Sequence, residues 1–125
     1  MKTSRLLTMS LMLACSSLVF ADTTALKKSD GILVTADGMT VYTFDKDAAD
    51  SGKSVCNGGC ASNWPPVAAP AAGTKMNAPY SVVTRDDGSA QLAYKGKPLY
   101  RFAADAKAGD RNGDNVKNIW HVVKD

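Results

Sequence analysis

The sequence predicts a small all-β antiparallel domain, folded as a sandwich or barrel-like pair of sheets and built from two internal repeats. Three observations predict it. Short apolar runs rich in β-branched and aromatic residues alternate with Gly-containing turns, which is typical of strands joined in hairpins. All twelve acidic residues are Asp, whereas helices favour Glu. A pattern of Gly, Tyr, Phe and Asp recurs at one constant offset, which indicates a duplicated unit.

Residues 1–21 have the three-part layout of a secretory signal peptide. Two basic residues precede an apolar or small run from Leu6 to Phe20, and Ala21 ends a small-residue cleavage site. The run is shorter than the roughly 20 residues that a membrane-spanning helix needs. We therefore expect export from a bacterial cytoplasm and a single mature domain, residues 22–125, that is periplasmic or secreted.

Cys15 gives an alternative form of export. In bacterial lipoproteins, a cysteine that follows a Leu-Ala-Gly-like box is acylated and becomes the first residue of the mature chain. Ala14 fits this box, whereas Met12 and Leu13 match it poorly, and the apolar run continues past Cys15 to Ala21. We expect free export, with a lipid anchor in the cell envelope as the alternative. Contact with a membrane is expected only if Cys15 is lipidated.

The mature domain is nearly neutral. Removing the signal peptide removes two basic residues and no acidic ones, so Lys and Arg together exceed Asp by one. No basic run or stripe, the usual electrostatic footprint of nucleic-acid binding, is present in the sequence. We therefore expect no nucleic-acid partner.

The first repeat, about residues 31–67, is expected to begin with a hairpin. Residues 32–34 and 41–44 are β-favouring runs, and the Ala-Asp-Gly sequence at 36–38 between them is a strong turn signal. A long polar loop, residues 48–63, fills the rest of this repeat. Binding residues are more common in such loops than in the strands that carry them.

A Pro- and Ala-rich segment, residues 65–79, connects the repeats. Because proline lacks the N–H donor that a central strand needs, this segment is expected to be an extended connector or a sheet edge. Beyond it, residues 81–84, 91–94 and 99–102 predict a three-stranded meander, with a turn at 95–98.

The second repeat, about residues 88–124, is expected to end in a strand. A second polar loop, residues 106–118, precedes the β-branched and aromatic run at 119–123. No window outside the signal peptide carries an apolar stripe of helical period, so no helix is expected in the mature domain.

The recurring pattern places aromatic and acidic side chains at matched positions. Alternate residues of a strand point to the same face, so the Tyr and Phe of each copy share one face. We expect these four rings to form the core between two hairpins. A Trp follows each copy. The matched residues are Tyr42, Phe44, Asp47 and Trp64 in the first repeat and Tyr100, Phe102, Asp105 and Trp120 in the second.

Asp47 and Asp105 follow the ends of their strands. A carboxylate in this position accepts backbone N–H bonds and fixes the loop that follows, so we expect a structural role for both. A catalytic pair is the alternative, because two Asp related by an internal twofold can approach one another.

Cys56 and Cys60 bracket a Gly-rich segment and are expected to form a disulfide in an oxidising compartment. The alternatives are chemical. Thiolates suit Cu(I) or Zn(II), and Met39, Met76 and His121 are weak candidates to complete a metal site. A short-loop disulfide can also take part in thiol exchange. The spacing matches neither the common zinc motifs nor the usual redox pair with two intervening residues.

His121 is the single histidine, so a multi-histidine metal centre is excluded, and no motif of the sequence indicates a catalytic triad. It alternates with Trp120 and is expected to be a partly exposed strand residue. The chain also lacks a phosphate-binding Gly loop and a Gly-x-Ser-x-Gly elbow. We therefore expect no enzyme and no cofactor. The predicted function is a non-catalytic binding or structural module of the cell envelope, and the alternative is a periplasmic metal-binding or thiol-redox protein that uses Cys56 and Cys60.

The two Tyr-x-Phe-x-x-Asp copies, together with the segment from Cys56 to Pro66, resemble the bacterial family called secreted repeat of unknown function. The resemblance covers about residues 31–124. Members of this family are often described as predicted lipoproteins with a Tyr-x-(Phe/Trp/Tyr)-x-x-Asp motif. The resemblance implies an envelope protein, often lipid-anchored, and supplies no settled biochemical activity.

Overall fold

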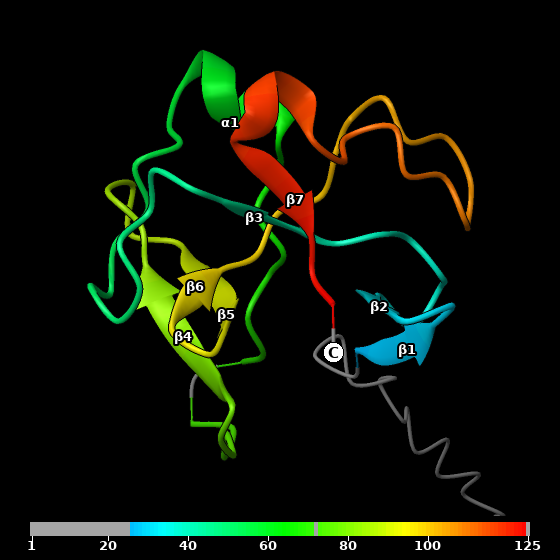
Figure 1. The fold of residues 1–125 in the computed structure, drawn as a ribbon. Helices are drawn as coiled ribbons and strands as arrows, with labels where there is room; N and C mark the ends of the chain where they lie inside the picture. The colour runs from blue at the N-terminus through cyan, green and yellow to red at the C-terminus, as the bar shows by residue number, and fades with distance from the viewer. Residues whose placement is uncertain (1–25, 72, 125) are drawn as a thin grey trace, which may run out of the picture.

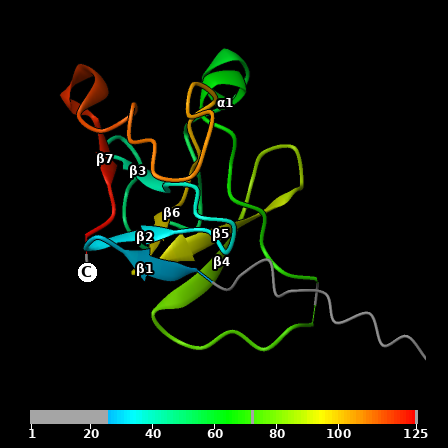
Figure 2. The same ribbon diagram turned by 90° about the vertical axis from the view of Figure 1, so that its right-hand side faces the viewer.

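The computed structural model describes residues 26–71 and 73–124, which form three small antiparallel sheets (Figures 1 and 2). The expected signal peptide and Cys15 lie outside these described residues. The antiparallel all-β fold predicted from the sequence is confirmed, and the described strands do not close into a barrel. The elements in chain order are β1 (Lys27–Ser29), β2 (Ile32–Val34), β3 (Tyr42–Phe44), α1 (Gly59–Asn63), β4 (Tyr80–Thr84), β5 (Ala90–Tyr94), β6 (Lys97–Pro98), the 3-10 helix η1 (Val116–Asn118) and β7 (Trp120–Val122).

The predicted meander is present as the sheet β4–β5–β6. Its last strand, Lys97–Pro98, lies before the predicted run 99–102, in which Tyr100 forms isolated bridges only. The turn that was predicted over 95–98 is confined to Lys95 and Gly96, which both have positive φ (51° and 80°). Two residues of this kind form a tight hairpin turn whose twist matches the flanking strands. Lys97 and Pro98 therefore already pair with Tyr94 and Ala93.

β3 and β7 come from different repeats and pair antiparallel, with Tyr42 opposite Val122. On its other side, Tyr42 is bridged to Tyr100. The Tyr42 N–H donates to the Tyr100 carbonyl at 2.8 Å, and the Tyr100 N–H donates to the Tyr42 carbonyl at 2.9 Å. Tyr100 is in turn bridged to Pro66. One backbone ladder thus crosses the molecule and alternates between the two repeats.

Two buried clusters form the core of the described residues. β2 is buried on both faces and contributes to both clusters, because alternate strand residues point to opposite sides. The aromatic cluster contains Ile32, Val34, Tyr42, Phe44, Cys56, Trp64, Tyr100, Trp120 and Val122. The aliphatic cluster contains Leu33, Val41, Val67, Leu92, Tyr94, Leu99 and Val123.

The expectation of no helix was wrong for two short segments, α1 and η1. The five residues of α1 are too few to show a helical period in the sequence. This helix is held instead by local bonds: the Ser62 N–H donates to the Gly58 carbonyl at 3.2 Å, and the Trp64 N–H donates to the Cys60 carbonyl at 2.8 Å. Strand β1, whose side chains are all exposed, was also not anticipated.

The first part of the Pro- and Ala-rich connector lies against the meander. The Val67 N–H donates to the Leu99 carbonyl at 2.9 Å, and the Val67 carbonyl accepts the Leu92 N–H at 2.8 Å. Val67 is buried, and the prolines at 65 and 66 precede it, where their missing donors break no bond of this ladder. The connector therefore carries the chain from Trp64 across one end of the sheet.

Candidate functional site

Three rings of the aromatic cluster and Phe102, which packs against it, form a stacked column. Phe44 stacks on Trp120 (centroids 4.1 Å apart), Trp120 on Trp64 (3.8 Å), and Trp64 on Phe102 (4.2 Å). Successive rings come from alternate repeats, so the Phe of each repeat stacks on the Trp of the other. Offset or parallel stacking of this kind adds about 0.5–1.5 kcal/mol per pair beyond the burial of apolar area. The column is a joint between the repeats.

The tyrosines of the repeated pattern bond the carboxylates of the opposite repeat. The Tyr42 hydroxyl donates to Asp105 Oδ2 at 2.6 Å, and the Tyr100 hydroxyl donates to Asp47 Oδ2 at 2.5 Å. All four side chains are buried. The spacing inside one repeat holds no information about a partner in the other, so the sequence did not predict this exchange of partners.

The second oxygen of each carboxylate fixes the polar loop that follows it. Asp47 Oδ1 accepts the Val55 N–H at 2.8 Å, and Asp105 Oδ1 accepts the Asn112 N–H at 2.9 Å. Each carboxylate thus contacts a loop of its own repeat and a tyrosine of the other repeat, an arrangement that we call a bracket. The two carboxylates share no hydrogen-bond partner among the described residues.

Burial and the bond to a carboxylate raise the pKa of both tyrosines well above the ordinary value near 10. An ionised Tyr42 or Tyr100 would lose its hydrogen bond and place a second negative charge beside an aspartate. Both hydroxyls therefore stay protonated as donors over the physiological range.

These raised pKa values predict alkaline destabilisation. Above about pH 10, tyrosine in the unfolded chain loses its proton while Tyr42 and Tyr100 keep theirs, so the unfolded state binds fewer protons. The free energy of unfolding then falls by up to about 1.4 kcal/mol per pH unit for each tyrosine. Below about pH 10 the stabilisation that the two protonated tyrosines provide is fully present. Urea unfolding from about pH 9 to about pH 11 measures the slope. Tyr100→Phe should remove about half of it; an unchanged slope in this variant would contradict the assignment.

A different cluster lies beside the first polar loop, where Cys56 and Cys60 form a disulfide. Arg85 extends under this loop from the end of β4 and is only 5% exposed. Its Nη1 donates to Ser54 Oγ (3.0 Å) and Gln91 Oε1 (2.7 Å). Its Nη2 donates to the Cys56 carbonyl and to Asn57 Oδ1 (3.3 Å). The guanidinium therefore holds the disulfide loop against the meander.

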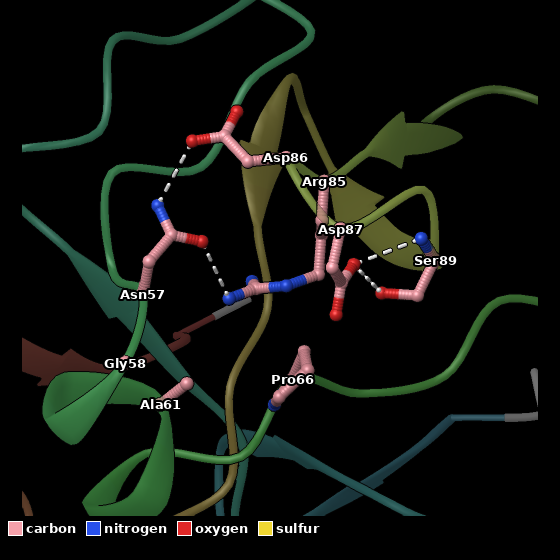
Figure 3. A pocket seen from close by; sticks show the side chains of 8 residues that line it. All are labelled: Asn57, Gly58, Ala61, Pro66, Arg85, Asp86, Asp87 and Ser89. Atoms are coloured by element: carbon pink, nitrogen blue, oxygen red, sulfur yellow. Dashed lines mark hydrogen bonds between the residues drawn. The ribbon is translucent and has the colours of Figure 1, made fainter.

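The Arg85 side chain lies in the wall of a surface hollow of about 430 Å³ (Figure 3). The carboxylates of Asp86 and Asp87 line the same hollow. Asp86 Oδ2 accepts from Asn57 Nδ2 at 3.3 Å, and Asp87 Oδ1 accepts from the N–H and hydroxyl of Ser89 at 2.9 and 2.6 Å. The bonds from Ser89 lower the pKa of Asp87. The lining residues are Asn57, Gly58, Ala61, Pro66, Arg85, Asp86, Asp87 and Ser89.

The sequence indicated only part of this hollow. The first polar loop was expected to carry binding residues, and Asn57, Gly58 and Ala61 belong to it. Residues 86–88 belong to the turn between β4 and β5, in which the Gly88 N–H donates to the Arg85 carbonyl at 2.9 Å. A single Arg beside a turn is a common surface pattern, so no signal in the sequence marked Arg85 as a buried cation.

The weak metal candidates lie in different surroundings. Met76 packs against the aliphatic cluster, whereas Cys56 belongs to the aromatic one. His121 Nε2 lies 2.8 Å from Asp45 Oδ2, and its Nδ1 lies 3.2 Å from Asn115 Oδ1. Met39 follows the first hairpin turn, where its N–H donates to Thr35 Oγ1 at 3.1 Å. Across the described residues, no group of three or more His, Cys, Asp or Glu side chains is placed to hold a metal ion.

The fold and its brackets define a class of protein: a tandem β repeat in which each unit completes the other. The chain belongs to the family described as secreted repeat of unknown function, whose model matches residues 24–68 and 81–124. No curated protein and no solved structure matches the chain. In the described part of the chain, no helix has the length and apolar character needed to cross a membrane.

Proposed function

We propose that this protein is a non-catalytic binding module of the bacterial cell envelope and that the hollow beside the disulfide loop holds its ligand. One observation carries the proposal. Arg85 is a buried cation in the wall of the hollow, and among the described residues no carboxylate lies within ion-pair distance of it. Burying a charge is costly unless a counter-charge compensates it. A ligand that enters the hollow can supply part of that compensation.

The buried tyrosines and aspartates support the choice of the hollow as the binding site, because they already bond one another in the interior. Tyr42 and Tyr100 donate to Asp105 and Asp47 in the interior, and both carboxylates also fix loops. All four side chains are buried and hydrogen-bonded within the protein, so they are not presented at the surface. The hollow, in contrast, is open at the surface and carries polar groups that point into it.

The two repeats also differ where binding would occur. The first polar loop carries the disulfide and α1, and it lines the hollow. The second polar loop, residues 106–118, contains no cysteine. This difference between the two loops supports a single binding site, carried by the first loop, on a scaffold of two similar repeats.

A variant that fills the hollow tests the proposal. Ala61 lines the hollow from α1 and is partly exposed, so Ala61→Trp should block the hollow and leave the core intact. We expect small polar compounds, screened by ¹H–¹⁵N NMR, to shift the amides of Asn57, Gly58 and Ser89 in the unmodified protein but not in this variant. Binding that persists in Ala61→Trp, or shifts confined to other surfaces, would contradict the proposal.

We further propose that the mature protein diffuses freely and begins at Asp22. This follows from the poor match of the residues before Cys15 to a lipoprotein box. The intact mass of the protein isolated from cells decides the point. A mass that corresponds to residues 22–125 is expected, and a mass that corresponds to an acylated chain starting at Cys15 would replace free diffusion with a lipid anchor.

A further inference from the structure

We infer that the ligand of the hollow is a small zwitterion, with a carboxylate and a primary ammonium group on neighbouring atoms, as in a free α-amino acid. The inference rests on the proposed function. It comes from the donors and acceptors in the hollow that are left without protein partners.

The cationic half of the site is one N–H group of Arg85. A guanidinium carries five N–H donors. The four on Nη1 and Nη2 are used by Ser54, Gln91, Cys56 and Asn57. The fifth, on Nε, has no acceptor among the described residues. No described side-chain N or O atom is both cut off from solvent and without a partner, so this N–H is reached from the surface and is available to a ligand carboxylate.

The anionic half consists of two carboxylate oxygens. Asp86 uses Oδ2 to accept from Asn57, and Asp87 uses Oδ1 to accept from Ser89. Asp86 Oδ1 and Asp87 Oδ2 accept no bond from the described residues. Figure 3 shows the Asp87 carboxylate beside the Arg85 side chain, with Asp86 at the edge near Asn57. An ammonium group that lies beside Arg85 can donate to Asp87 Oδ2, and the Asp86 carboxylate adds negative charge at the edge of the hollow.

The charge of the lining excludes the simpler ligands. A plain anion would be attracted by Arg85 but repelled by two carboxylates, and a plain cation would face the opposite conflict. A ligand with both charges meets each group with its complement. Ala61 and Pro66 add an apolar wall against which a short alkyl side chain can pack. None of the residues that line the hollow is aromatic, which disfavours a ligand held by ring stacking.

Three probes of nearly equal size separate the contributions: L-alanine carries both charges, propionate only the carboxylate, and ethylammonium only the ammonium. Each is titrated into the disulfide-bonded protein at neutral pH while the amides of Gly58 and Ser89 are followed by NMR. We expect L-alanine to bind with a Kd about tenfold or more below those of the two other probes, since each removed charge costs at least one charge-assisted hydrogen bond.

Variants at the exposed carboxylates then assign the ammonium contact without disturbing Arg85, whose loss would release the disulfide loop. Asp87→Asn should raise the Kd for L-alanine about tenfold and leave the Kd for propionate unchanged or lower, and Asp86→Asn should raise the Kd for L-alanine by a smaller factor. Asp30→Asn, in the exposed turn between β1 and β2, is the matched control and should change neither value.

Other outcomes contradict the zwitterion inference. If propionate or ethylammonium binds as tightly as L-alanine, or if both carboxylate variants bind L-alanine normally, the zwitterion inference fails while the hollow remains a binding site. If none of the three probes shifts the amides around the hollow, the zwitterion inference fails, and the compound screen with Ala61→Trp decides the proposed function separately.

Discussion

Replacing Trp120 by alanine is expected to lower the free energy of unfolding by about 3–5 kcal/mol, the usual cost of truncating a buried Trp or Phe. Trp120 occupies an inner place in the stacked column and contacts Phe44 and Trp64 face to face, with the edge of Tyr100 against it. Alanine would leave a cavity at the joint between the repeats. The total free energy of unfolding of a small domain is only about 5–15 kcal/mol. This single change should therefore remove a large part of the stability of the protein.

Equilibrium unfolding in urea, followed by circular dichroism, measures the effect. Val82→Ala is the matched control, because Val82 lies in β4 with 44% of its surface exposed and should cost well under about 1 kcal/mol. A loss below about 1 kcal/mol for Trp120→Ala would show that the column does not hold the repeats together.

The second large effect is expected at Gly113. A Cβ atom built on this residue would lie 2.7 Å from Trp64 Cη2 and 2.9 Å from Tyr42 Cζ. Both are atoms of rigid rings that are themselves held by the column and the brackets. The Gly113 N–H also donates to the Tyr42 hydroxyl at 3.2 Å. Gly113→Ala therefore forces the rings apart, and we expect it to cost about 2–3 kcal/mol.

Gly59→Ala supplies the control for this substitution. Gly59 is the first residue of α1, and a Cβ atom there meets nothing within 4 Å. It lacks the positive φ that would strain an alanine. The change should be neutral or stabilise the protein by up to about 1 kcal/mol, because alanine favours helix. Thermal unfolding of both variants compares them directly; equal melting temperatures would refute the steric argument.

The sequence was sufficient for the parts of the fold that depend on local pattern. Alternation and turn signals predicted the meander and the turn at 36–38. The two runs that flank this turn do not pair as predicted: β2 pairs with β1 and β3 with β7, and a Val34–Thr40 bridge closes the turn. The recurrence of Tyr42 and Tyr100 predicted two related units. Helix α1 was missed because it has too few residues to show a period and depends on bonds within the disulfide loop. β1 was missed because its three side chains, Lys27 to Ser29, are all polar and exposed.

The interactions that cross between repeats could not be predicted, because each repeat contains both a Tyr and an Asp. The sequence does not show that each Tyr bonds the Asp of the other repeat. Asp47 follows Tyr42 closely in the sequence, yet its partner is Tyr100. The same limit applies to the hollow. Arg85 becomes a buried cation only when the first polar loop folds over it, and that placement depends on Cys56 and Gln91 in two other segments.

The recurring Tyr and Asp side chains join the two repeats, and we propose that binding is therefore left to the loops. A double-mutant cycle measures the bonds that form this joint. Tyr42→Phe and Asp105→Asn, made singly and together, should show a coupling energy of about 1–2 kcal/mol in urea unfolding, whereas Tyr42→Phe with Asp47→Asn should show coupling close to zero. Coupling to Asp47 instead of Asp105, or none to either, would contradict the exchange of partners on which this account rests.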